Sequence, residues 1–363
     1  MTEPDVSASP DAIRHAMADF DYDLPPELIA QEPLADREAS RLLLLPRDGS
    51  PFEHRSFREL PDLLDPGDLL VVNDSRVIPA RLIGHRETGA EVEILLLRRE
   101  ESGRSPGLWR ALARPTRRLR IDERIVIPAK TADDTEAFAY LREKLDDGQV
   151  LVELDDALTT DLDHFGRVPL PPYITHHLDD DERYQTVYSA QKGSAAAPTA
   201  GLHFTDDLFR RLDAKGIGRT SVTLHVGLDT FRPVNEDFAE DHVIHQEWCS
   251  VSPEAWEAIA AARERGSRVV AVGTTAARTL ETLGQRVKAG NSGPFSDMTG
   301  IYITPGYDWQ MVDALITNFH LPKSTLLLMI SAFAGRDHVF AAYRAATAER
   351  YRFFSFGDAM LII

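Results

Sequence analysis

The chain of 363 residues has a single cysteine, Cys249, and no long hydrophobic run. One cysteine excludes an intramolecular disulfide framework and a zinc or iron–sulfur site built from several cysteines, so we expect Cys249 to be a small buried side chain without a chemical role. Near the C-terminus, the stretch without charged residues begins after Lys323 and ends at Arg336. A membrane span needs roughly 18 to 20 apolar residues, so this shorter stretch predicts a buried helix and no membrane partner.

Basic residues are also scarce: 40 Lys and Arg stand against 58 Asp and Glu, a formal net charge of −18. Such an acidic chain argues against a nucleic-acid partner, because phosphates are normally bound by a basic surface. The N-terminal MTEPDVSASPDAIRHAM lacks the basic region and apolar core of a signal peptide, so we expect a cytosolic protein. One segment differs: between Arg98 and Arg124 there are nine arginines and four carboxylates. Solvated strand faces explain this excess of arginine as well as a phosphate-binding surface does.

Common catalytic signatures are missing as well. The sequence has no Ser-His-Asp order, nucleophile elbow or paired-carboxylate motif. His242, His245 and Glu247 have a spacing that resembles metal ligands, but no HExxH helix accompanies them. We therefore expect no metal site.

Two different residue patterns divide the chain into two parts. From about residue 66 to 154, short Val-, Ile- and Leu-rich segments alternate with Gly and Pro, which predicts the strands of a small barrel. After Thr205, helical patterns alternate with buried strands, which predicts a layered α/β domain. Thr205 and Ser252 are expected to begin two of the helices, Gly216 and Gly335 to end two, and the last strand is expected at 353–363. We expect an α/β protein with a layered α/β/α main domain and an inserted small antiparallel β-barrel domain. Residues 1–16 are expected to form a disordered extension, residues 17–64 and 155–363 the discontinuous main domain, and residues 65–154 the barrel.

Polar side chains cluster where predicted strands end and helices begin, the usual place for a ligand in such a domain. A helix start carries free N–H groups and the positive end of the helix dipole, which suit a carboxylate or phosphate. The segment ITNFHLPKSTLLL has this form, as do VVAVGTTAARTLE and the loop APTAGLHFT. The candidates on these segments are Asn318, His320, Lys323 and Ser324; Gly273, Thr274, Thr275 and Arg278; and Thr199, Gly201 and His203. Helix capping and core packing remain open as alternative roles for each.

Further candidates lie elsewhere. His225 ends the predicted strand SVTLHV, and the stretch NDSRVIPARL brings polar side chains together at an edge of the predicted barrel. The candidates in that stretch are Asn73, Arg76 and Arg81. An Asx-turn with solvated arginines is an equally simple interpretation of it.

Nine segments closely resemble the S-adenosylmethionine:tRNA ribosyltransferase-isomerase family of queuosine biosynthesis. They follow in the family's order, at similar spacing, from about residue 19 to the C-terminus: FDYDLPPELIAQEPLADREASRLLLL, NDSRVIPARL, VPLPPYI, ERYQTVYS, APTAGLHFT, TLHVGLDTFRPV, AVGTTAARTLE, TNFHLPKSTLLLMISAFAG and YRFFSFGDAMLI. The first residues of the chain are outside the pattern, and Asp229 stands where the family usually has glycine.

The resemblance implies a cytosolic bacterial enzyme that transfers and isomerises the ribosyl part of S-adenosylmethionine onto the aminomethyl-deazaguanine wobble base of tRNA. The implied products are epoxyqueuosine in tRNA, adenine and methionine. S-adenosylmethionine is then consumed as a co-substrate, and no prosthetic group is implied. We expect a monomer whose partners are S-adenosylmethionine and tRNA carrying the deazaguanine wobble base. The implied fold, an α/β domain with an inserted barrel, agrees with the pattern of the residues.

The implied chemistry assigns roles to the candidates. The sulfonium acidifies a neighbouring ribose C–H, so a base must take that proton, and adenine must leave protonated or hydrogen-bonded. Histidine suits both steps near neutral pH. By the motif matches, the catalytic candidates, in no order, are His203, His225, His245 and His320. The two helix starts are candidates for the methionine carboxylate, and Asn73, Arg76 and Arg81 for tRNA phosphates together with the arginine-rich segment.

Three other classes of protein remain possible from the residues. A methyltransferase or nucleotide transferase would use the same helix starts, and a methylated product with release of S-adenosylhomocysteine would reveal it. A non-catalytic tRNA-binding protein would bind anticodon loops and release no adenine. A metalloenzyme would bind metal stoichiometrically at His242, His245 and Glu247.

Overall fold

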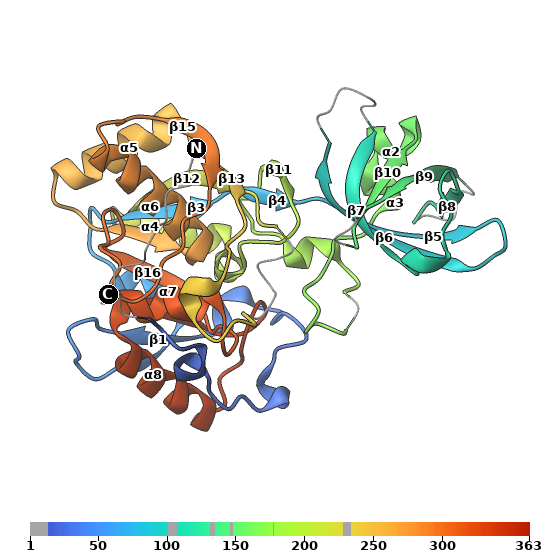
Figure 1. Cartoon of the computed structure of the whole chain (residues 1–363). Helices are drawn as coiled ribbons and strands as arrows, with labels where there is room; N and C mark the ends of the chain where they lie inside the picture. The colour runs from blue at the N-terminus through green and yellow to red at the C-terminus, as the bar shows by residue number, and fades with distance from the viewer. Residues whose placement is uncertain (1–13, 101–106, 131–134, 146–147, 177, 228–233) are drawn as a thin grey trace, which may run out of the picture.

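The structure, a computed structural model, describes residues 14–100, 107–130, 135–145, 148–176, 178–227 and 234–363. Figure 1 shows a main domain, which carries the C-terminus, and a smaller barrel beside it. Between them lie two short strands that pair in parallel, β4 (Ser75–Val77) and β11 (Gln191–Ser194).

A sheet of nine strands, within the described residues, forms the centre of the main domain. Four neighbouring strands, β12, β3, β14 and β16, are parallel, so their carboxyl ends meet at one edge of the sheet. In spatial order the strands are β15 (Phe295–Thr299), β13 (Glu247–Val251), β12 (Gly218–Leu224), β3 (Leu69–Asn73), β14 (Val269–Val272), β16 (Ala314–Asn318), β17 (Ala359–Ile362), β1 (Arg41–Leu45) and β2 (Glu53–Ser56).

Side-chain alternation along the strands divides the core between the two faces of this sheet. In β1, Leu43 and Leu45 belong to one hydrophobic cluster and Leu42 and Leu44 to the other. The first cluster is covered by α5 (Pro253–Glu264), α6 (Gly273–Lys288), α7 (Thr325–Ala334) and α8 (Arg336–Ala348), and the second by α1 (Leu60–Leu63) and α4 (Asp206–Ala214). The expected α/β/α layering is confirmed.

Capping residues set the ends of these helices where the sequence predicts them. Thr205 accepts the backbone N–H of Leu208 at 3.0 Å and begins α4. The helix stops before Gly216, which has φ +81°, a conformation that favours glycine. Ser252 begins α5 in the same way, and Gly335 separates α7 from α8. Side-chain caps therefore supply partners for the N–H groups at these helix starts.

The barrel is closed and antiparallel. Its order is β10 (Val150–Leu154), β7 (Leu108–Arg114), β6 (Glu91–Arg99), β5 (Arg81–Arg86), β8 (Arg124–Pro128) and β9 (Glu136–Lys144). Two short helices, α2 (Asp156–Thr160) and α3 (Leu162–Phe165), add Leu158 and Phe165 to its hydrophobic core. The barrel unit thus continues past residue 154.

The structure corrects two expected boundaries. Residues 67–73 were expected in the barrel, but β3 lies in the centre of the large sheet, and every residue of it is buried. A continuous apolar run is typical of a parallel strand covered on both faces. The strand expected at 353–363 begins only at Ala359, because residues 352–358 form a tight turn. A Cβ at Gly357 would lie 2.4 Å from the Arg352 carbonyl oxygen.

At the N-terminus, the extension expected to be disordered falls mostly outside the described residues. Its last residues are ordered by contacts with the main domain: Arg14 pairs with Asp241, and Ala16 forms a β-bridge with Phe238. Among the described residues, no single helix is long and apolar enough to cross a membrane; α7 and α8 meet that test only together, and they are bent by 113° at their junction.

Candidate active site

A pocket lies at the carboxyl ends of β14 and β16. It and its open mouth enclose about 730 Å³, within the usual size range of ligand sites. Seven of the residues selected from the sequence line it: Thr199, Gly273, Thr274, Thr275, Asn318, His320 and Ser324. Parallel strands place these distant segments together, because the loops after their carboxyl ends share one edge of the sheet.

The two helix starts at the pocket differ in their capping. Ser324 caps α7 by accepting the N–H of Leu327 at 3.2 Å, and its hydroxyl donates to the Leu321 carbonyl at 2.7 Å. No side chain caps α6, which begins at Gly273 with φ +87°. The first N–H groups of α6 lack a side-chain partner at the pocket, so this helix start can accept an anion.

An amide group with one unused end lies beside this helix start. Thr199 donates its hydroxyl hydrogen to Asn318 Oδ1 at 3.0 Å, and Asn318 Nδ2 has no partner although the residue is only 4% exposed. A buried donor without a partner is costly, and a ligand acceptor would remove that cost. Behind the pocket, Asn73 Nδ2 donates to Thr275 Oγ1 at 3.1 Å and to the Leu224 carbonyl at 3.0 Å. Asn73 therefore supports a lining residue.

His320 is the histidine, among the four candidates, that lines the pocket. Its Nε2 lies 2.7 Å from Thr317 Oγ1. Its backbone is held on both sides: the N–H donates to Tyr343 Oη at 2.8 Å, and the carbonyl accepts the Tyr22 hydroxyl at 2.5 Å. Burial lowers the pKa of His320 to about 3, so its imidazole is neutral at physiological pH.

The other three histidines lie outside the pocket lining. His203 is buried, with Nδ1 2.9 Å from Ser40 Oγ and its ring against Phe57, and burial lowers its pKa to about 3. His225 stacks on Trp248 with ring centroids 4.9 Å apart, and burial lowers its pKa as well. His245 is exposed. Their catalytic roles remain predictions.

Several selected residues have protein partners of their own. Arg278 forms a buried ion pair with Glu247, whose other oxygen accepts the Gly227 N–H at 2.9 Å. A Cβ on Gly201 would lie 1.9 Å from the Tyr188 hydroxyl. An alanine at position 201 would therefore force the Tyr188 side chain to shift.

The remaining charged candidates form ion pairs at or near the surface. Arg76 pairs with Glu182, and Arg81 with Glu93 at 2.8 Å. Lys323, at φ +52°, pairs with Asp21 at 2.9 Å. None of the three lines the pocket.

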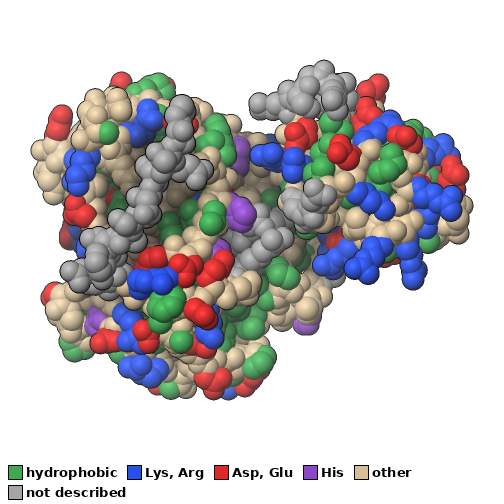
Figure 2. All heavy atoms as spheres, viewed as in Figure 1, with side chains coloured by type: hydrophobic (Ala, Val, Ile, Leu, Met, Phe, Trp, Pro, Cys, Tyr) green, Lys and Arg blue, Asp and Glu red, His purple; other side chains and the backbone are tan. Residues whose placement is uncertain are grey.

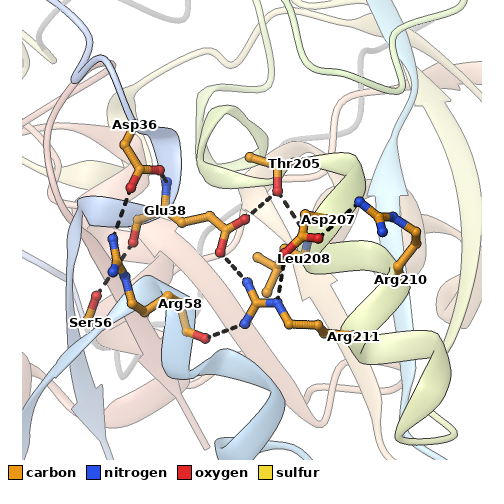
Figure 3. Close-up of polar contacts among 9 residues, drawn as sticks. All are labelled: Asp36, Glu38, Ser56, Arg58, Thr205, Asp207, Leu208, Arg210 and Arg211. Atoms are coloured by element: carbon orange, nitrogen blue, oxygen red, sulfur yellow. Dashed lines mark hydrogen bonds and ion pairs between the residues drawn. The ribbon is translucent and has the colours of Figure 1, made fainter.

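A polar network ties the start of α4 to the N-terminal segment (Figure 3). Glu38 binds both Thr205, which caps the helix, and Arg211 one and a half turns later. Arg211 also donates to the Arg58 carbonyl at 2.9 Å. The 3-10 helix η7 (Thr199–His203), which supplies Thr199 to the pocket, immediately precedes this helix. The network therefore fixes the chain that leaves the pocket.

Sequence reasoning did not select two aromatic residues that line the same pocket. Tyr173 and Phe354 contact each other with ring centroids 4.8 Å apart and planes at 54°. The Tyr173 hydroxyl lies 2.7 Å from Ser355 Oγ, and Ser355 also lines the pocket. Both segments were noted for family resemblance, but neither aromatic has a local signal that separates a ligand contact from core packing.

Basic side chains gather on the barrel, as Figure 2 shows along its rim. Arg114, Arg117 and Arg118 are exposed at the end of β7 and in η5 (Thr116–Arg118), and they form no ion pair with any described residue. Other arginines of the barrel are neutralised: Arg110 pairs with Glu100, and Arg124 with Glu87.

No group of three or more His, Cys, Asp or Glu that could hold a metal occurs in the described parts of the chain. Glu247 is engaged by Arg278, and His242 lies 3.1 Å from Glu236. Cys249 is buried, and burial raises the pKa of its thiol to about 12. Asp229 is outside the described residues.

The fold and the pocket define a two-part α/β protein whose ligand site lies at helix starts, after the carboxyl ends of parallel strands. Residues 17–362 match the family model described as queuosine biosynthesis protein. Curated relatives named S-adenosylmethionine:tRNA ribosyltransferase-isomerase include one from Symbiobacterium thermophilum, 50% identical over 96% of this chain and 99% of its own length. Another, from Anaeromyxobacter sp., is 52% identical over 95% of this chain and 98% of its length.

A solved structure is also similar. The crystal structure of an S-adenosylmethionine tRNA ribosyltransferase from Thermotoga maritima has a TM-score of 0.55 and 39% sequence identity, covering 95% of this chain and all of that one. The chain belongs to the queuosine biosynthesis protein family, and the resemblance seen in the sequence is confirmed.

Proposed function

We propose that the chain transfers and isomerises the ribosyl group of S-adenosylmethionine onto the aminomethyl-deazaguanine wobble base of tRNA, giving epoxyqueuosine with release of adenine and methionine. The observation that supports this most is the pocket itself. The uncapped start of α6 and the unpartnered amide of Asn318 open onto one cavity, and S-adenosylmethionine carries a carboxylate that both can bind. The names of the curated relatives agree with this ligand.

His320 is the candidate best placed to handle a proton. The reaction needs a base that takes a ribose proton beside the sulfonium, and a donor that supports the departing adenine. His320 lines the pocket as a neutral imidazole. The lowered pKa makes it a weak proton acceptor, so hydrogen bonding to the departing adenine suits it better than removing the ribose proton. Thr317 and the two tyrosines fix its ring and backbone, so little reorganisation is needed at the reacting atoms.

Exposed barrel arginines support tRNA as the second substrate despite the net charge of −18. Arg114, Arg117 and Arg118 have no carboxylate partner among the described residues, so they remain available for phosphates. The reacting base would have to leave its stack to reach the pocket.

The test is to incubate the protein with S-adenosylmethionine and tRNA that carries the aminomethyl-deazaguanine base. Adenine release is followed by chromatography, and the digested tRNA by mass spectrometry. We expect adenine and an epoxycyclopentanediol-modified base in equal amounts. A methylated tRNA with S-adenosylhomocysteine, or no reaction by folded protein over a range of salt, would reject the proposal.

A further inference from the structure

We propose that Tyr173 and Phe354 form the wall against which the adenine ring of S-adenosylmethionine stacks, while the start of α6 holds the methionine carboxylate. This inference rests on the proposed function and adds an orientation for the ligand. It assigns a role to two residues whose segments gave no site signal in the sequence.

The two rings are neighbours in the pocket lining, so a planar group that stacks on one ring meets the other at an angle. Their centroids are 4.8 Å apart with planes at 54°, and both residues line the cavity. The Tyr173 hydroxyl is fixed 2.7 Å from Ser355 Oγ, so the ring has a defined position. Burial raises the pKa of Tyr173 to about 12, and the ring stays uncharged at physiological pH. An uncharged aromatic surface suits a planar base.

The backbone at Phe354 supports a ligand role. Its φ of +68° lies in the left-handed region, which side chains larger than glycine rarely adopt. The surrounding turn holds it there: its N–H donates to the Phe319 carbonyl at 3.1 Å, and its own carbonyl accepts the Gly357 N–H at 2.9 Å. Asp358, 2% exposed, fixes the same turn by accepting the N–H groups of Arg352 at 2.8 Å and Arg41 at 2.9 Å. Glycine would relieve the strain but remove the ring from the pocket.

The polar groups of the pocket favour this orientation over the reverse. The unpaired amide of Asn318 and the free N–H groups of α6 suit an anion. Of the parts of S-adenosylmethionine, the carboxylate is the anionic one and the purine is the planar aromatic one. Stacking the purine on Tyr173 and Phe354 satisfies both preferences at once.

The experiment measures ligand binding by calorimetry on the full chain, with tRNA that lacks the aminomethyl-deazaguanine base, so that no turnover occurs. The ligands are S-adenosylmethionine and 5′-methylthioadenosine, which keeps the purine nucleoside and lacks the carboxylate. Tyr173→Leu removes the ring, and Tyr173→Phe is the matched control that keeps it. Phe354→Leu provides an independent variant, and thermal unfolding checks that each variant is folded.

We expect Tyr173→Leu and Phe354→Leu to raise the Kd of both ligands about ten-fold, and Tyr173→Phe to change it less than three-fold. Unchanged binding of 5′-methylthioadenosine by both leucine variants would overturn the inference, as would wild-type protein that binds S-adenosylmethionine but not 5′-methylthioadenosine. Unchanged Kd values for both ligands, together with a raised KM for the modified tRNA in the separate turnover assay, would also overturn the inference and assign the wall to the tRNA base. The proposed function is tested separately from this inference: it fails if the wild-type protein releases no adenine in the turnover assay.

Discussion

Replacing Arg278 with methionine should strongly destabilise the protein, because Glu247 would keep its charge in the interior. The two side chains are only 8% and 7% exposed, and they form a direct ion pair. Removing one partner of such a pair costs about 3–5 kcal/mol, because the remaining charge is left uncompensated. That is a large part of the 5–15 kcal/mol by which domains are typically stable.

Guanidinium chloride unfolding at pH 7, followed by tryptophan fluorescence, measures this loss. Arg278→Met and Glu247→Gln are compared with the double variant, which removes both charges. We expect the double variant to lose less stability than the two single variants added together. An Arg278→Met protein within about 1 kcal/mol of wild type, with a weakened affinity for S-adenosylmethionine instead, would refute the structural role. It would favour contact of Arg278 with the methionine carboxylate, one of the roles considered for this helix start from the sequence.

Three further predictions follow from the same structure. Thr274→Asp places a carboxylate at the start of α6, and two carboxylates about 5 Å apart repel by about 3 kcal/mol at an effective dielectric of 20. The KM for S-adenosylmethionine should therefore rise at least ten-fold, while the uncharged Thr274→Asn variant stays near wild type. Equal effects of the two substitutions would contradict the anion site. Burial lowers the pKa of His203 from 6.5 to about 3. Its contribution to the free energy of unfolding is therefore fully present above pH 6.5 and is lost by about 1.4 kcal/mol per pH unit as the pH falls toward 3. Denaturant unfolding from pH 7.5 to 4.5 should show a smaller loss of stability per pH unit for His203→Gln than for wild type, and an unchanged slope would count against a neutral buried histidine. Gly201→Ala should lower the thermal midpoint by overpacking against the Tyr188 hydroxyl, and adding Tyr188→Phe should restore part of it; a Gly201→Ala protein that keeps its midpoint but binds substrate poorly would show a ligand contact instead.

The fold was largely predictable because local patterns agree with the tertiary structure. Helices with caps, such as α5 after Ser252, and the alternating strands of the barrel were recognised from periodicity and punctuation. The assignment of β3 failed, because a short apolar run does not reveal which sheet it joins. The strand expected to begin at residue 353 was also wrong, because residues 352–358 form a turn whose geometry depends on Asp358 and on the close approach at Gly357.

The candidate site was predictable where strand ends bring residues together. Gly273, Thr275 and Asn318 meet in one pocket because β14 and β16 are adjacent and parallel. The ion pair of Arg278 was not predictable, because this residue lies in α6 and its partner Glu247 lies in β13, 31 positions away in the sequence. Tyr173 was missed because a lone aromatic residue in a loop gives no sign of whether it faces a ligand or the core.

The most direct measurement is a crystal structure of this protein with S-adenosylmethionine bound. We predict the methionine carboxylate at the N–H groups of Gly273 to Thr275, an acceptor of the ligand on Asn318 Nδ2, and the purine against Tyr173. S-adenosylmethionine bound away from the ends of β14 and β16, or with its carboxylate distant from the start of α6, would contradict this account of the site.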